Sequence, residues 1–241
     1  MKVITRLVIL LLCLPLLSCA HIQYVHERES LPRASFVEIT TRVVKRGCTD
    51  NVCGAMRNAA VSSGAIIRTD PDGSYVIGSN HVCAIKKLES HKGVSVTFSA
   101  VGTSGSSHEG HILATDAEND LCVMYVPGLK GTPIILRDHP PKHGEKVYNL
   151  ASPQGVAAPP HNIPVFSGYY SGRDGRWDVY TIPAVGGSSG SPIVDVDGYM
   201  VGIIQAHLRG FNHLTISSNY LKIKKMMTDV VSGRLSMRVY N

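Results

Sequence analysis

Residues 186–195 of the chain read GGSSGSPIVD, a group of glycines and serines directly before an apolar run. Such a stretch is either a linker or a tight loop that holds one reactive serine. A serine hydroxyl is a weak nucleophile at neutral pH, so it needs a neighbouring base, and flanking glycines let a substrate carbonyl approach the backbone. On the second interpretation Ser189 is the nucleophile, and the N–H groups of Gly187 and Ser189 form an oxyanion hole.

Two other segments contain the partners that such a serine requires. His81 lies in GSYVIGSNHVCAI after a strand-like run, and Asp120 opens an apolar strand in HILATDAENDLCVMYV. An imidazole can act as base and then as acid near neutral pH, and a buried carboxylate on its other nitrogen fixes the tautomer. Taken alone, each of these residues is more simply explained by a structural role than by a catalytic one. The three motifs together predict a triad. Glu118 is the rival for the carboxylate, and Ser188 and Ser191 are the rivals for the nucleophile.

The elements that must position these residues are short apolar runs, which alternate with turn signals from about residue 37 onward. The runs have the length of strands, are rich in β-branched residues, and are separated by turn signals such as Asp174-Gly175 and Asp197-Gly198. Because the pattern has no βαβ rhythm, we expect an all-β barrel or sandwich.

The last part of the chain has a helical period instead. In SNYLKIKKMMTDVVSGR the apolar residues recur at i, i+3, i+4, i+7 and i+8 from Ile223 to Val231, which predicts one buried helix face. Ser217 or Ser218 is the expected N-cap, and Gly233 lies just beyond the helix.

The first twenty residues, MKVITRLVILLLCLPLLSCA, have the pattern of an export signal. Two basic residues precede an apolar run, residues 7–17, that is too short to span a bilayer. Leu-Leu-Ser-Cys resembles a bacterial lipobox, which predicts removal of residues 1–18 and lipidation of Cys19. The alternative is an ordinary cleavage site before His21. We expect residues 19–36 to be a tether, and the protein to be exported, either as a lipoprotein on the periplasmic face of a bacterial membrane or as a soluble protein.

Charge and cysteine content narrow the possible partners. The formal charge of +6 includes Lys2 and Arg6 of the signal, and no basic stripe with interleaved aromatics is present, so we expect no nucleic-acid partner. Cys48 and Cys53 bracket CTDNVC, which predicts a local disulfide in an oxidising compartment. Cys83 and Cys122 either pair or are buried thiols. A lone pair of cysteines is weak evidence for zinc, and we expect no metal and no cofactor.

The chain resembles the serine proteases of the trypsin/chymotrypsin fold, and among them the bacterial high-temperature-requirement (Deg-type) branch. Four stretches carry the resemblance: SSGAIIRTDPDGSYVIGSNHV (62–82), ATDAENDLCVM (114–124), VYNLASPQG (147–155) and GGSSGSPIVDVDGYMVGI (186–203). The order His81, Asp120, Ser189 is that of this fold. The resemblance implies that His81 is the general base and then acid, that Asp120 orients it, and that Ser189 is the nucleophile.

The resemblance also implies the architecture. The family fold is two packed six-stranded antiparallel β-barrels with the active site in the cleft between them. We assign residues 37–140 to the N-terminal barrel, with His81 and Asp120. Residues 141–241 then form the C-terminal barrel, with Ser189 and the terminal α-helix.

Departures from the family pattern bear on specificity. Pro183 stands where digestive trypsins carry the Asp that selects Lys or Arg, so we expect small or medium apolar P1 residues. Ile204, Gln205, Ala206 and His207 are expected to pair with the substrate backbone and to line one pocket wall, which His207 could partly block. The PDZ domain that usually follows the protease in Deg-type enzymes is not expected.

The expected function is that of an exported serine endopeptidase that cleaves polypeptides through an acyl-enzyme intermediate. The first rival is a non-catalytic protein that holds peptides in the same cleft. A second rival is an esterase or transferase that uses the same acyl chemistry. The sequence makes no prediction of the oligomeric state.

Overall fold

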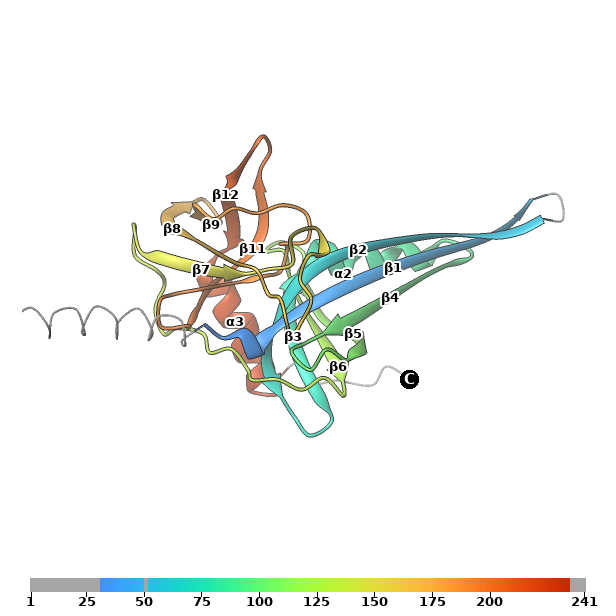
Figure 1. The fold of residues 1–241 in the computed structure, drawn as a ribbon, viewed down its shortest axis with the longest axis horizontal. Coiled ribbons are helices and arrows are strands. Elements are labelled where there is room, and N and C mark those ends of the chain that lie inside the picture. The colour runs from blue at the N-terminus through green and yellow to red at the C-terminus, as the bar shows by residue number, and fades with distance from the viewer. Residues whose placement is uncertain (1–30, 50–51, 235–241) are drawn as a thin grey trace, which may run out of the picture.

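The computed structural model describes residues 31–49 and 52–234. The predicted signal segment, Cys19 and most of the predicted tether lie outside the described residues. Figure 1 shows two β-barrels side by side, with a long two-stranded arm that projects from the first. In the described part of the chain, every helix is too short or too polar to cross a membrane.

The first barrel closes in the strand order β1-β2-β3-β6-β5-β4. Its strands are β1 (Phe36–Thr49), β2 (Val52–Thr69), β3 (Gly73–Ser79), β4 (Val94–Val101), β5 (Ser107–Asp116) and β6 (Leu121–Pro127). The 3-10 turn η1 (Arg33–Ser35) precedes β1, and helix α2 (Asn80–Cys83) and the 3-10 turn η2 (Ala84–Ser90) follow β3.

The second barrel closes in the order β10-β11-β12-β9-β8-β7. Its strands are β7 (Lys146–Leu150), β8 (Val165–Asp174), β9 (Trp177–Tyr180), β10 (Pro192–Val194), β11 (Met200–Leu208) and β12 (Phe211–Ser218), with the 3-10 turn η3 (Pro153–Gly155) after β7 and helix α3 (Tyr220–Val231) at the end. The prediction of two six-stranded antiparallel barrels with a C-terminal helix is therefore confirmed.

Strands β3 and β6 are buried on both faces, which explains why their sequences read as continuous apolar runs. Side chains alternate along a strand, so Val76 points into the first barrel whereas Tyr75 and Ile77 point toward the second. The cluster between the barrels also receives Ile223 and Val230 from α3, both fully buried. The helix therefore covers the seam between the two barrels.

Helix α3 begins later than the sequence pattern predicts. Its N-cap is Asn219, whose side chain accepts the N–H of Leu221 at 2.9 Å. The prediction of Ser217 or Ser218 is wrong, because both serines belong to β12, where they pair with β9. Because the two serines pair with β9, they are not available to cap the helix, and Asn219 caps it instead.

A buried carboxylate fixes the start of the helix on the second barrel. Asp178 accepts the N–H of Tyr220 at 2.8 Å, the hydroxyl of Tyr170 at 3.1 Å and Nε of Arg173 at 2.9 Å. Burial, and then the negative charge of Asp178, raise the pKa of Tyr170 to about 12. Tyr170 therefore stays a hydrogen-bond donor over the whole neutral range.

The arm is a feature that the sequence pattern did not predict. β1 and β2 pair without a break from Phe36↔Ala65 to Thr49↔Val52. The predicted disulfide between Cys48 and Cys53 is confirmed and closes the ladder near the tip. Strand β12 was also not predicted, because FNHLTISS has few apolar residues.

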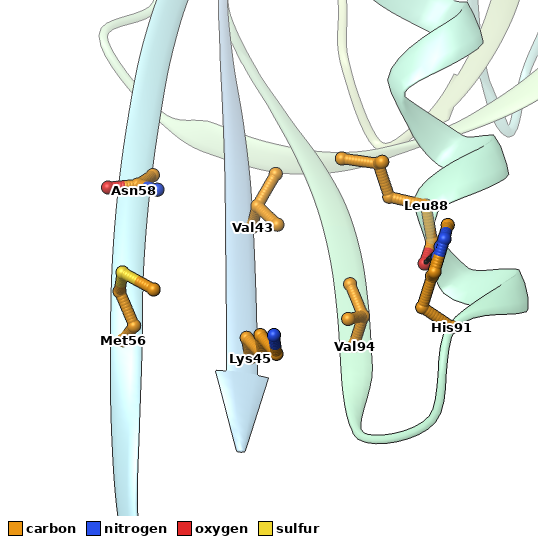
Figure 2. A pocket seen from close by; sticks show the side chains of 7 residues that line it. All are labelled: Val43, Lys45, Met56, Asn58, Leu88, His91 and Val94. Atoms are coloured by element: carbon orange, nitrogen blue, oxygen red, sulfur yellow. Dashed lines mark hydrogen bonds between the residues drawn. The ribbon is translucent and has the colours of Figure 1, made fainter. Parts of the chain in front are cut away.

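One face of the arm forms a groove of about 250 Å³ with η2. Figure 2 shows its lining, which consists of Val43, Lys45, Met56, Asn58, Leu88, His91 and Val94. The strand residues come from β1, β2 and β4, and Met56 and Leu88 are 62% and 42% exposed. None of these residues is among the predicted site residues.

The second disulfide joins Cys83 and Cys122, which resolves the alternative left open by the sequence in favour of pairing. Both sulfur-bearing side chains are buried inside the first barrel. The bond connects the residue two positions after His81 with the residue two positions after Asp120.

Removing the Cys83–Cys122 disulfide should destabilise the protein more than removing Cys48–Cys53. A cross-link restricts the unfolded chain, and in the chain-entropy model the effect grows with loop length. The sequence separations of 39 and 5 residues correspond to about 4 and about 2 kcal/mol. Urea unfolding of Cys83→Ala/Cys122→Ala and Cys48→Ala/Cys53→Ala checks the order, and equal losses would contradict it.

Candidate active site

His81 and Asp120 form a direct pair at the edge of the first barrel. His81 Nδ1 lies 2.8 Å from Asp120 Oδ2, and the backbone N–H of His81 donates to Asp120 Oδ1 at 2.8 Å. Both carboxylate oxygens of Asp120 are therefore hydrogen-bonded to His81. The His81 side chain is half exposed and that of Asp120 is one-fifth exposed. This geometry directs the other ring nitrogen, Nε2, away from Asp120.

The backbone around Asp120 is held in an uncommon conformation. Asp120 has a φ of 51°, a region that non-glycine residues seldom occupy. Its carbonyl accepts the N–H of Asn80 at 3.1 Å, which ties the turn to the start of α2. In the preceding turn, Asp116 accepts both the backbone and the side-chain N–H of Asn119. The carboxylate thus projects toward His81 from a turn that is fixed on both sides.

Ser189 is the partly exposed serine of the glycine-rich loop. Ser188 and Ser191 are buried, and Ser191 Oγ accepts Nδ2 of Asn149 at 2.7 Å. Ser189 Oγ donates to the backbone carbonyl of Gln205 at 3.3 Å, and within the described residues no hydrogen bond joins it to His81. Of the three serines in the loop, Ser189 is the one that solvent and substrate can reach.

The two predicted oxyanion donors have no acceptor in the part of the chain that the structure describes. The carbonyl of Gly186 accepts the N–H of Gln154 at 2.7 Å. Because the C=O and N–H of a trans peptide point in opposite directions, the N–H of Gly187 points away from Gln154. Within residues 31–49 and 52–234, neither the N–H of Gly187 nor that of Ser189 pairs with an acceptor. Neither N–H is therefore committed to another group of the described chain.

Ser63, on β2 of the first barrel, holds the glycine-rich loop around Ser189 in place. Its hydroxyl donates to the carbonyl of Gly187 at 2.9 Å and accepts the N–H of Ser152 at 2.9 Å. Its own N–H donates to the carbonyl of Ser189 at 2.8 Å. Ser63 is not among the site residues predicted from the sequence. The available signal was the serine pair in SSG (62–64), since two serines are unusual in a buried strand.

The predicted substrate-binding residues divide into a buried and an exposed group. Ile204 lies in the core of the second barrel and Gln205 is 2% exposed, so neither side chain faces a substrate. Ala206 and His207 are exposed on β11, and Pro183 is half-buried before the loop. Of the four predicted residues on β11, Ala206 and His207 are therefore the two whose side chains a substrate can reach.

The other candidates for the triad and for a metal site lie apart from these contacts. Glu118 is exposed, and it is Asp120 that contacts His81. Within the described ranges, three or more His, Cys, Asp or Glu side chains do not gather in a way that could hold a metal ion.

Comparisons with known proteins agree with the fold. A family model described as "Trypsin-like peptidase domain" matches residues 62–203, a range that includes His81, Asp120 and Ser189. Among solved structures, the chain is similar to the HtrA-type protease AlgW with a decapeptide, with a TM-score of 0.67 and 17% identity over 87% of this chain and 67% of that chain. At this identity the similarity shows the fold alone. No curated protein sequence is similar enough to count as a match.

Gly190→Ala should destabilise the protein strongly, whereas Gly186→Ala should not. A Cβ on Gly190 would lie 2.1 Å from the carbonyl oxygen of Ser63, and Gly190 has a φ of +86°. A Cβ on Gly186 meets nothing within 4 Å. We expect a loss of at least about 2 kcal/mol for Gly190→Ala, from strain and displaced backbone together. Chemical denaturation measures both variants, and equal stability would show that the loop does not press against the first barrel.

Proposed function

Because this chain belongs to the trypsin-like peptidase family, we propose that it is a serine endopeptidase with His81, Asp120 and Ser189 as its triad. The observation that carries the proposal is the pair formed by His81 Nδ1 and Asp120 Oδ2, 2.8 Å apart. This pair gives the imidazole one defined tautomer, with Nε2 available as a base. The accessible hydroxyl of Ser189 and the free N–H of Gly187 supply the remaining parts.

The proposed reaction begins with a rotation of the Ser189 side chain from the carbonyl of Gln205 toward His81. Ser189 Oγ then attacks the substrate carbonyl carbon as its proton passes to Nε2 of His81. The N–H groups of Gly187 and Ser189 bind the oxyanion. His81 returns the proton to the leaving amine, and water hydrolyses the acyl-enzyme by the same route.

Polypeptides are the proposed substrates. The similar protease AlgW was solved with a decapeptide, and the exposed end of β11 gives an extended peptide a strand to pair with. Pro183 offers no counter-ion to a basic side chain, so we propose that small or medium apolar residues occupy the P1 position.

Export and lipid attachment at Cys19 are a separate proposal. It rests on the short apolar run of residues 7–17 and on the Leu-Leu-Ser-Cys sequence that follows. A lipid on Cys19 would anchor the protease at the periplasmic face of a bacterial membrane.

One observation favours the alternative, a protein that binds peptides without cleaving them. Ser189 Oγ bonds to the carbonyl of Gln205 and not to His81. If this arrangement persisted with a peptide in the cleft, the hydroxyl would not lose its proton and the protein would only bind.

A fluorophosphonate should label Ser189 covalently. We expect Ser189→Ala to abolish labelling and His81→Ala to slow it strongly, because the hydroxyl then lacks its base. Peptide hydrolysis should fall by about four to six orders of magnitude in Ser189→Ala. Intact-mass spectrometry measures labelling, and cleavage of a mixed peptide library measures activity.

Ser191→Ala is the matched control for this experiment, since Ser191 lies in the same loop but is buried. The Ser191→Ala protein should still be labelled by the fluorophosphonate at Ser189. A wild-type protein that binds peptides, yet is never labelled and never cleaves, would establish the binding alternative.

Cys19→Ser should prevent lipid attachment. After expression in bacteria, the wild-type protein should gain the mass of a diacylglyceryl group and should partition into a detergent phase, whereas the variant should do neither. Cys13→Ser should behave like the wild type. An unmodified wild-type protein with His21 as its first residue would establish ordinary cleavage instead.

A further inference from the structure

We infer that Gln205 is a positioning residue that connects all three segments of the triad through one buried chain of hydrogen bonds. The inference rests on the proposed function, because it assigns a role within that site. Gln205 was predicted to line the substrate pocket, but its side chain is 2% exposed and points into the junction of the two barrels. Each of its polar atoms there has a partner.

The carbonyl end of the side chain contacts the histidine segment. Gln205 Oε1 accepts the hydroxyl of Ser79, the last residue of β3. Asn80 and His81 follow directly as the first residues of α2. The bond therefore fixes the strand end from which the imidazole projects, and it crosses from the second barrel to the first.

The amino end of the side chain contacts the aspartate segment through one intermediate. Gln205 Nε2 donates to Ser218 Oγ at 2.8 Å, and Ser218 Oγ donates to the carbonyl of Asn119 at 2.5 Å. That carbonyl belongs to the peptide that precedes Asp120. It lies next to the φ of 51° that Asp120 adopts, so the bond from Ser218 helps to hold this rare conformation.

The backbone of Gln205 contacts the serine. Its carbonyl accepts Ser189 Oγ at 3.3 Å. The N–H of Gly190, the next residue in the loop, donates to the carbonyl of Ile204 at 2.7 Å. The position of Ser189 is thus set by the same strand segment that holds the other two members.

The amide group suits this place because its oxygen accepts from Ser79 while its nitrogen donates to Ser218, and the group carries no charge. Ser79, Gln205 and Ser218 are all at most 2% exposed, so water cannot replace a lost bond. A charged side chain would put an unpaired charge into this buried site. An apolar one would leave two buried hydroxyl groups with fewer partners.

Gln205→Met tests the inference, because it keeps the length of the side chain and removes both hydrogen bonds. We expect kcat to fall by about tenfold to hundredfold with KM nearly unchanged, since small misplacements of reacting groups slow the chemical step. The hydrogen-bonded Nδ1 proton of His81 should also broaden or shift upfield in the proton NMR spectrum. Ser218→Ala and Ser79→Ala should each show part of the same effect.

The double variant Gln205→Met/Ser218→Ala distinguishes one connected chain of hydrogen bonds from two contacts that act independently. If the two residues act through one chain, the double variant should lose little more activity than the worse single variant. Ser79→Ala and Ser218→Ala remove few atoms, so they still decide the question if Gln205→Met does not fold.

Thr215→Val is the matched control. Thr215 is buried on β12 near Ser218, and its hydroxyl donates to the carbonyl of Tyr180 at 3.4 Å, outside the chain of bonds. It should lower the melting temperature without changing kcat or the His81 signal. A Gln205→Met protein that is less stable but has the kcat and the His81 signal of the wild type would overturn the inference.

Failure of the proposed function would give a different result from failure of the inference about Gln205. If the wild-type protein neither hydrolyses peptides nor reacts with a fluorophosphonate, the NMR measurement still applies, because it requires no turnover. Loss of the His81 signal in Gln205→Met would then support positioning in a binding site. An unchanged signal would refute it.

Discussion

Hydrogen bonds that cross from one closed barrel to the other are the constraint on which the site depends. Each barrel completes its own backbone pairing, so nothing in the barrels themselves fixes their relative position to a fraction of an ångström. The bonds from Ser63 to the loop around Ser189, and from Ser79 to Gln205, do so. They are buried, and an unmade bond there costs about 1–3 kcal/mol, which penalises any slippage of the barrels.

The apolar packing at the seam acts together with these bonds. The cluster between the barrels includes Tyr75 and Ile77 of β3 and the buried face of α3. Apolar contacts are weakly directional, so they hold the barrels together without selecting one rotation. The polar contacts select it. The division explains why serines and an amide occur inside an otherwise apolar interface.

Alternating apolar runs and turn signals mark most strands, so the pattern alone predicted an all-β fold. The two six-stranded barrels and the pairing of His81 with Asp120 followed from the resemblance to the trypsin fold, because residues 39 positions apart are not connected by any local signal. The role of Ser63 could not be read from the sequence, since it arises from contacts with residues at least 89 positions away. Gln205 was placed in the pocket because its strand position was right but the face that it presents was not known.

The errors in the predicted strands and in the predicted helix cap have causes in particular segments of the chain. Strand β12 has few apolar residues, so its pattern is weak, and this moved the expected helix cap from Asn219 to the preceding serines. The segment from Gly54 to Asn58 is poor in strand-forming residues, yet β2 runs through it because β1 offers a complete set of pairing partners. Long-range pairing overrides intrinsic preference there.

Strand β2 forms one side of the arm and also contacts the glycine-rich loop around Ser189. Cys53 near the tip and Ser63 at the loop are ten residues apart on β2, about 33 Å at the rise of an extended strand. The ladder with β1 has no bulge between them. One uninterrupted ladder therefore connects the tip of the arm with Ser63, whose hydroxyl donates to the carbonyl of Gly187.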